Sequence, residues 1–164
     1  IYTAHQGEGL KHRALSVMLY RRKNGKVEWL LQKRAGTKPV FAHFWGNTCC
    51  TNLRPGDEYL PRAVSRLEEE MGIGVGEKDL RILYRFSYRA DDPNKPGWCE
   101  NELDTVIVGE WDGETKLNPE EASDAKWIEE EKLKKDIEEK GEIYAPWLRM
   151  MMEHGKFGGG TVNV

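Results

Sequence analysis

The chain has 164 residues, of which 38% are hydrophobic and 32% charged, and this length is sufficient for a domain with its own core. The formal net charge of −3 argues against broad electrostatic attraction to nucleic acid or to a membrane surface. No apolar run approaches the ~20 residues that span a bilayer. Three cysteines, an odd number, argue against a disulfide framework and for a reducing compartment. We therefore expect a cytoplasmic protein that binds neither nucleic acid nor membranes.

The N-terminal part predicts a β-hairpin. Residues 1–12 are polar and predict an irregular lead-in, after which alternating residues predict a strand from Ala14 to Arg21. Asn24-Gly25 is a strong signal for a type I′ turn, so the chain should return along residues 27–32. A charged loop is expected at 34–43, followed by a short extended segment from Phe44 to Cys50.

The clearest helix is predicted from Glu58 to Met71. Pro61 is typical of an early helical turn, and Gly72 of the left-handed position that ends a helix. The apolar residues that recur at the helical period are Leu60, Ala63, Val64, Leu67 and Met71.

The remainder predicts further strands and then two helices. The expected elements are extended runs at 80–88 and 100–108 around a turn-rich loop at 91–97, a short strand ending at 127–128, and helices at 129–140 and after Pro146. No internal repeat or domain boundary is evident, so residues 1–155 should form a single domain, followed by a glycine-rich mobile tail at 156–164. Sheet elements with few helices between them are typical of a mixed α+β sandwich.

Cys50 is the first candidate for chemistry. A lone cysteine is more often a small buried hydrophobe than a reactive group. Cys50, however, directly precedes the polar residues Thr51-Asn52 and the turn at Pro55-Gly56, which places it near the mouth of a surface loop. In an extended segment Cys49 points the opposite way and is the better candidate for core packing.

Glu100 and Glu102 are the second candidates. On a strand they share one face, with β-carbons roughly 7 Å apart. Two solvated acids on an edge strand are one interpretation, but the apolar residues that follow indicate a buried strand, where a carboxylate pair requires a cation. His5 and His12 are the obvious co-ligands for Zn²⁺, Mn²⁺ or Mg²⁺.

Three basic residues are candidate anion-binding groups. Arg34, Lys38 and Arg66 would each ordinarily be a solvated charge. Arg66 lies four residues from Glu70 on one flank of the predicted helix, at the edge of the core. Together they suggest a diphosphate site, in which the cations hold the oxygens and Mg²⁺ bridges them to Glu70.

These features resemble a known pattern. From His5 to about Trp147 the chain is similar to type I isopentenyl diphosphate isomerases, a branch of the Nudix-like fold. The matching segments are His5, His12-Arg13-Ala14, Lys33-Arg34-Ala35 with Lys38, Trp45 to Cys50, Arg66 with Glu70-Met71-Gly72, Tyr88-Arg89-Ala90, Glu100-Asn101-Glu102 and Ala145-Pro146-Trp147. The order, spacing and identity of these segments all agree with the family pattern. The resemblance implies an α+β fold with a Nudix-like mixed-sheet sandwich flanked by helices.

The resemblance also implies a reaction. It is the interconversion of isopentenyl and dimethylallyl diphosphate, in isoprenoid precursor synthesis, by protonation and deprotonation through a tertiary carbocation. Cys50 matches the catalytic thiol, and Glu102 the acid on the opposite face of the substrate. Tyr88 matches the phenol that supports proton transfer, and Trp147 the indole that faces the cation.

The implied ligands follow the same positions. The set His5, His12, Glu100 and Glu102 matches a protein-bound metal site, while Glu70 matches the ligand of the Mg²⁺ that arrives with the diphosphate. Arg34, Lys38 and Arg66 match phosphate-binding positions. We expect a monomer whose partner is a small prenyl diphosphate.

Two positions depart from the family pattern. The third metal histidine of the family falls at Asn52, and an amide oxygen is a weaker ligand for Zn²⁺ than an imidazole. A family lysine that contacts phosphate falls at Ile1.

Two other functions compete with the isomerase. A Nudix hydrolase needs G-x₅-E-x₇-R-E-U-x-E-E-x-G-U. Aligned on residues 69–73, this chain has Thr51 for the glycine, Asp57 for the first acid and Ser65-Arg66 for the Arg-Glu pair. A cation at 66 removes a metal ligand, which argues against water activation by clustered metals. The third possibility is a non-catalytic descendant that only binds prenyl diphosphates.

Overall fold

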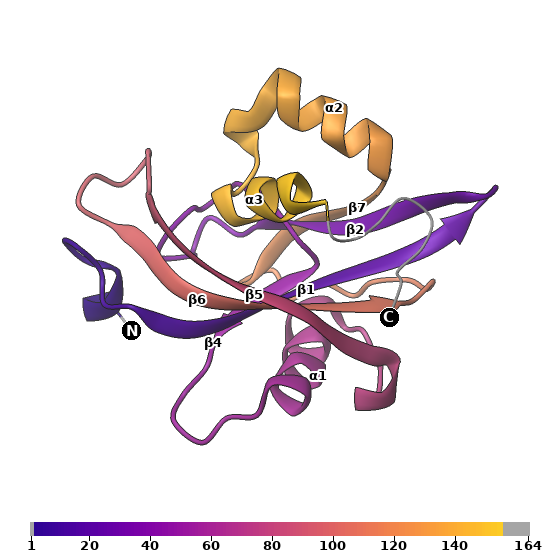
Figure 1. Ribbon diagram of the computed structural model, residues 1–164, viewed down its shortest axis with the longest axis horizontal. Coiled ribbons are helices and arrows are strands. Elements are labelled where there is room, and N and C mark those ends of the chain that lie inside the picture. The colour runs from indigo at the N-terminus through magenta and orange to yellow at the C-terminus, as the bar shows by residue number, and fades with distance from the viewer. Residues whose placement is uncertain (1, 156–164) are drawn as a thin grey trace.

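A computed structural model describes residues 2–155 and shows a mixed sheet with helices on both faces (Figure 1). Strand β1 (His12–Lys23) runs through its centre. It pairs antiparallel with β2 (Lys26–Arg34) and β4 (Cys49–Asn52), and parallel with β6 (Cys99–Glu110). The predicted tail at 156–164 lies outside the described residues.

The remaining strands extend the sheet at its sides. Strand β5 (Leu80–Asp91) pairs antiparallel with β6, while β3 (Trp45–Gly46) and β7 (Ala122–Glu129) both pair with β2. The turn between β1 and β2 has positive φ at Asn24 (51°) and Gly25 (74°), as a type I′ turn requires. The predicted hairpin is therefore confirmed.

Helices cover the two faces of the sheet separately (Figure 1). Helix α1 (Tyr59–Met71) buries Ala63, Leu67 and Met71 in one core. Helices α2 (Glu130–Lys140) and α3 (Pro146–His154) pack over the opposite core. Three short 3₁₀ turns complete the described elements: η1 (Tyr2–His5), η2 (Glu77–Asp79) and η3 (Gly141–Ile143). The predicted fold class, a mixed-sheet sandwich flanked by helices, is confirmed.

Helix α1 ends where the sequence predicts. Gly72 adopts φ of 64°, and its amide donates to the Glu68 carbonyl. A β-carbon at Gly72 would lie 2.8 Å from the backbone oxygen of Lys116. The left-handed conformation and this close approach both favour glycine.

Parts of the predicted secondary structure were wrong. Strand β1 begins at His12 rather than Ala14, because His12 already pairs in register with Glu102 of β6. The lead-in contains the 3₁₀ turn η1. The expected extended segment at 44–50 is instead two short strands, β3 and β4, that pair with different partners.

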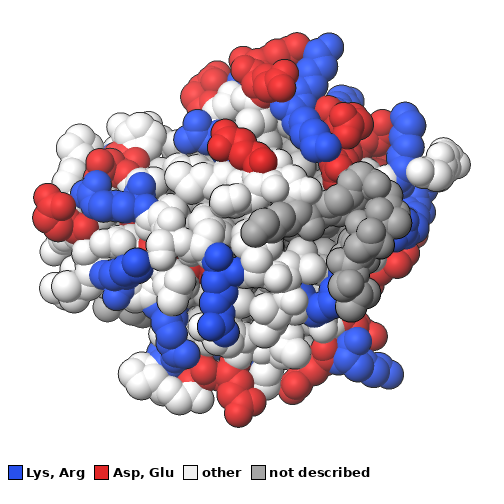
Figure 2. Space-filling view, viewed as in Figure 1, with Lys and Arg blue, Asp and Glu red and all other residues white. Residues whose placement is uncertain are grey.

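Charged residues of both signs are interspersed on the face of the molecule that Figure 2 shows. Among residues 2–155, no helix has the length and apolar character needed to cross a membrane.

Candidate active site

His5 and His12 meet the acidic start of β6. The segment between them folds against this strand: the Gly7 amide donates to the Gly97 carbonyl, and His5 Nδ1 lies 3.2 Å from the Cys99 carbonyl oxygen. His5 Nδ1 is also 3.1 Å from Glu100 Oε2, which lies 3.8 Å from His12 Nε2. The ligand atoms of these three residues all lie within 4.8 Å of one another.

This cluster fits a divalent metal ion. His12 Nε2 and Glu100 Oε2 are buried atoms that make no hydrogen bond. Buried polar atoms that make no hydrogen bond are costly, and these two lie within 4.8 Å of each other and of a ring nitrogen of His5. Two imidazoles with carboxylate oxygen are donors that suit Zn²⁺ or Mn²⁺. The predicted metal-binding set is thus brought together by the fold, with Asn52 lining the same cavity.

Glu102 connects the metal cluster to Tyr88. The Tyr88 hydroxyl donates to Glu102 Oε2 at 2.8 Å, and Glu102 Oε1 lies 3.5 Å from His12 Nε2. Burial and the negative charge of Glu100 raise the pKa of Glu102 to about 7. Burial and the adjacent Glu102 raise the pKa of the Tyr88 phenol well above its ordinary value. A carboxyl group with such a pKa is able to give or take a proton at neutral pH.

Cys50 and Cys49 face opposite sides of β4, as predicted. Cys49 is fully buried in the core under α1, whereas Cys50 is half-buried and lines the cavity together with Glu102. Burial raises the pKa of the Cys50 thiol to about 12, although the charge of Arg34 opposes this effect. The thiol therefore carries its proton at neutral pH.

Arg34 joins Cys50 to Trp147. Its Nη1 lies 3.5 Å from Cys50 Sγ, and its guanidinium carbon lies 5.4 Å from the Trp147 ring centroid. Nε and Nη2 donate to the carbonyls of Phe41 and Val40. Trp147 is 2% exposed, and its Nε1 donates to Asn47 Oδ1 at 2.8 Å. In this state a cation already covers the indole.

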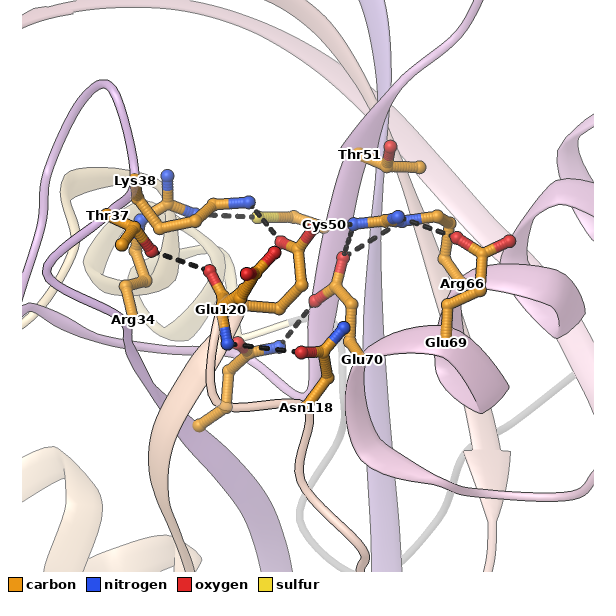
Figure 3. Close-up of polar contacts among 12 residues, drawn as sticks. Arg34, Thr37, Lys38, Cys50, Thr51, Arg66, Glu69, Glu70, Asn118 and Glu120 are labelled. Atoms are coloured by element: carbon orange, nitrogen blue, oxygen red, sulfur yellow. Dashed lines mark hydrogen bonds and ion pairs between the residues drawn. The ribbon is translucent and has the colours of Figure 1, made fainter.

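Lys38 and Arg66 approach the cavity from opposite sides of Cys50 (Figure 3). Both form ion pairs with Glu121: Lys38 Nζ lies 2.5 Å from Glu121 Oε2, and Arg66 Nη2 lies 3.2 Å from Glu121 Oε1. Arg66 also donates to Glu70 Oε1 through Nε and Nη2.

Glu70 is 3% exposed, and Gln32 Nε2 donates to its Oε2 at 2.9 Å. A carboxylate has about four lone-pair positions, so Oε2 retains one that a cation is able to use. Arg66 lies at the edge of the core as expected, whereas Glu70 is buried more deeply than expected.

The cavity has a volume of about 410 Å³ and gathers most of the predicted site. The predicted residues that line it are His5, Arg34, Lys38, Cys50, Asn52, Arg66, Glu100 and Glu102. Tyr88 and Trp147 are buried beside the cavity and contact Glu102 and Arg34, respectively.

Sequence reasoning missed Glu121, which looks like one solvated acid in the polar run 118–121. It also missed Gln32, which reads only as part of a strand.

Comparisons with known proteins identify the family. The NUDIX domain family model matches residues 10–149. An isopentenyl-diphosphate Delta-isomerase 1 of Aromatoleum aromaticum is 39% identical over 150 residues, which are 92% of this chain and 80% of that protein. An isopentenyl-diphosphate Delta-isomerase of Dinoroseobacter shibae is 37% identical over 162 residues, covering 97% of this chain and 87% of that one.

A solved structure supports the fold. The crystal structure of DR0079 from Deinococcus radiodurans superimposes with a TM-score of 0.70 at 17% identity, covering 92% of this chain and 85% of the other. The matches with these sequence relatives cover most of each relative and most of this chain. The chain therefore belongs to the isopentenyl-diphosphate Delta-isomerase family of NUDIX-domain proteins.

Proposed function

We propose that the chain interconverts isopentenyl and dimethylallyl diphosphate, using Cys50 and Glu102 as the two groups that exchange protons with the substrate. One observation carries this proposal: the Cys50 thiol and the Glu102 carboxyl group line the same cavity as the cations Lys38 and Arg66. A ligand held by its diphosphate at these cations can extend its short olefin between the thiol and the carboxyl group.

The proposed reaction adds one proton to the substrate and removes another, so the product has the same composition and charge as the substrate. One group delivers a proton to the terminal alkene carbon, which leaves a tertiary cation, and the other removes a proton from the neighbouring methylene carbon, which forms the new double bond. Tyr88 supports Glu102 through its 2.8 Å hydrogen bond. The reaction requires that water be kept from the cation, which would otherwise be hydrated to an alcohol.

Trp147 is the proposed partner of the cation. Its indole needs no counter-charge to stabilise positive charge and does not form a covalent adduct with it. The Arg34 guanidinium carbon lies 5.4 Å from the centroid of this ring, so we expect the guanidinium to turn toward the diphosphate when the substrate binds.

His5, His12, Glu100 and Glu102 are the residues that would hold the protein-bound divalent metal, with Asn52 as an additional oxygen donor. A metal ion there would supply positive charge that offsets two buried carboxylates. Glu70 would bind the Mg²⁺ that accompanies the diphosphate. A monomeric state and a cytoplasmic location remain predictions.

Proton NMR on the purified chain tests this function. We expect dimethylallyl diphosphate to form from isopentenyl diphosphate with Mg²⁺ and added Zn²⁺ or Mn²⁺, with deuterium uptake in D₂O. If the chain binds the substrate but yields neither product nor deuterium incorporation with any of these metals, the result would favour a non-catalytic descendant that only binds prenyl diphosphates. Release of inorganic phosphate from nucleoside diphosphate derivatives would favour the hydrolase.

A further inference from the structure

Glu121 bridges the two basic residues at the phosphate end of the cavity. One carboxylate oxygen, Oε2, lies 2.5 Å from Lys38 Nζ, and the other, Oε1, lies 3.2 Å from Arg66 Nη2. All three side chains line the cavity (Figure 3 shows Lys38 and Arg66). The carboxylate thus joins an ammonium and a guanidinium that originate from different parts of the fold.

The backbone fixes Glu121 at this position. Its carbonyl accepts from the Ala35 amide at 3.0 Å, and its own amide donates to the Asn118 carbonyl at 2.9 Å. The neighbouring Glu120 carbonyl accepts from Thr37 Oγ1 at 2.7 Å. The loops that carry Lys38 and Glu121 are therefore pinned to each other, and a change at this contact is confined to the side chains.

The surroundings strengthen these ion pairs. The exposed fractions of the side chains are 19% for Lys38, 14% for Arg66 and 22% for Glu121. Water screens charges less at such sites than at an open surface. Without the Glu121 carboxylate, Lys38 would lose this ion pair, whereas Arg66 would keep its ion pairs with Glu69 and Glu70. A phosphate group makes the same contacts, with negative oxygens shared between an ammonium and a guanidinium.

We propose that Glu121 occupies a phosphate position between Lys38 and Arg66 and is displaced from both when a diphosphate binds. This inference rests on the proposed function for the identity of the ligand. A ligand must then contact both cations better than the carboxylate does, and the cost of breaking the ion pairs of Glu121 is the same for every ligand that displaces it. Glu121 should therefore weaken the binding of phosphate ligands. A diphosphate, with more negative charge and oxygens on two phosphorus atoms than a monophosphate, has more interactions with which to offset this cost.

Calorimetric titration with magnesium pyrophosphate and with inorganic phosphate tests this role. Glu121→Gln keeps the size of the side chain and removes its charge. We expect it to bind pyrophosphate about tenfold more tightly than the wild type does, and to bind phosphate more tightly as well. Glu120→Gln makes the same charge change at the adjacent, exposed acid and should leave both affinities unchanged.

Unchanged or weaker pyrophosphate binding by Glu121→Gln would overturn the inference; weaker binding would mean that Glu121 helps to hold the ligand or its Mg²⁺. A crystal structure of the wild-type chain with magnesium pyrophosphate gives an independent test if the variant does not fold. Lys38 and Arg66 should then contact phosphate oxygens, with the Glu121 carboxylate turned away. Ion pairs to Glu121 that persist beside bound pyrophosphate would contradict the proposal.

The outcome is separable from the proposed function. A wild-type chain that binds pyrophosphate but does not isomerise the olefin would remove the isomerase proposal and leave the role of Glu121 intact. An active isomerase whose Glu121→Gln variant shows wild-type affinities would remove the role of Glu121 alone.

Discussion

Tyr88 and Glu102 are direct cross-strand partners between β5 and β6, and the phenol donates to the buried carboxyl group at 2.8 Å. Both residues are at most 7% exposed. Since the strands fix the two β-carbons, the hydrogen bond fixes the direction in which Glu102 presents its oxygens. The Tyr88 hydroxyl therefore positions the carboxyl group that we propose exchanges protons with the substrate.

Tyr88→Phe removes this hydrogen bond and should lower kcat roughly 10- to 100-fold, because a hydrogen bond to a charged group contributes about 1.5–3 kcal/mol. KM should change little, since Tyr88 does not contact the phosphate end of the cavity. Steady-state kinetics of the isomerisation check this result. Tyr84→Phe is the matched control: Tyr84 lies on the same strand but packs against Phe86 and His154. Equal losses from both variants would show that the effect is structural.

The two adjacent cysteines should respond differently to serine. Cys50→Ser should abolish turnover and leave the fold intact, because Cys50 lines the cavity and its thiol is the proposed proton carrier. Cys49→Ser should keep most of its kcat but lose about 1–3 kcal/mol of stability, because it replaces a fully buried thiol of the core cluster under α1 by a more polar hydroxyl. Kinetics and thermal unfolding of both variants measure the contrast. Comparable loss of activity from Cys49→Ser would place catalysis on the other face of β4.

Asn52→His should raise metal affinity. Asn52 lines the cavity that contains His5, Glu100 and Glu102, and an imidazole binds Zn²⁺ more strongly than an amide oxygen does. Elemental analysis after dialysis against a chelator should show more retained metal than in the wild type, while His5→Ala should retain less. Identical metal content in Asn52→His and the wild type would exclude position 52 from the coordination sphere.

Local signals explain why several elements were predictable. The turn at Asn24-Gly25 and the helix ending at Gly72 depend on backbone conformations that few residues adopt. The interior of β1 was harder to predict. Ser16 interrupts a run of apolar residues as if its face of the sheet were less buried, yet it is only 1% exposed because helices cover both faces. Ser16 is accommodated by donating to the buried Asp104 at 2.7 Å.

The candidate site was predictable where residue types reveal their chemistry. Paired acids entering an apolar strand required a cation, and the fold does place His5 and His12 beside Glu100. The partner of Lys38 and Arg66 could not be predicted in this way. Glu121 reaches them only through the loop contacts that the tertiary structure creates, and a single acid in a polar run carries no local signal.

The ion pairs of Glu121 should also make stability depend on pH. Burial by itself would raise the pKa of Glu121, but its contacts with Lys38 and Arg66 outweigh burial and lower it. A carboxyl group whose pKa is lower in the folded state stabilises the fold above its unfolded pKa of about 4.3, and this contribution is lost as pH falls through the folded pKa. At pH 7 the wild type should therefore exceed Glu121→Gln by up to about 1 kcal/mol in the free energy of unfolding.

Urea unfolding of both proteins without phosphate ligands, at a series of pH values from 7 downward, measures this difference. The gap should be constant at neutral pH and close below about pH 4, where Glu121 of the folded wild type takes up its proton. Glu120→Gln should show a smaller gap throughout, because Glu120 is exposed. A gap for Glu121→Gln that persists or widens in acid would mean that the carboxylate is not stabilised by Lys38 and Arg66, and that its place between them has another cause.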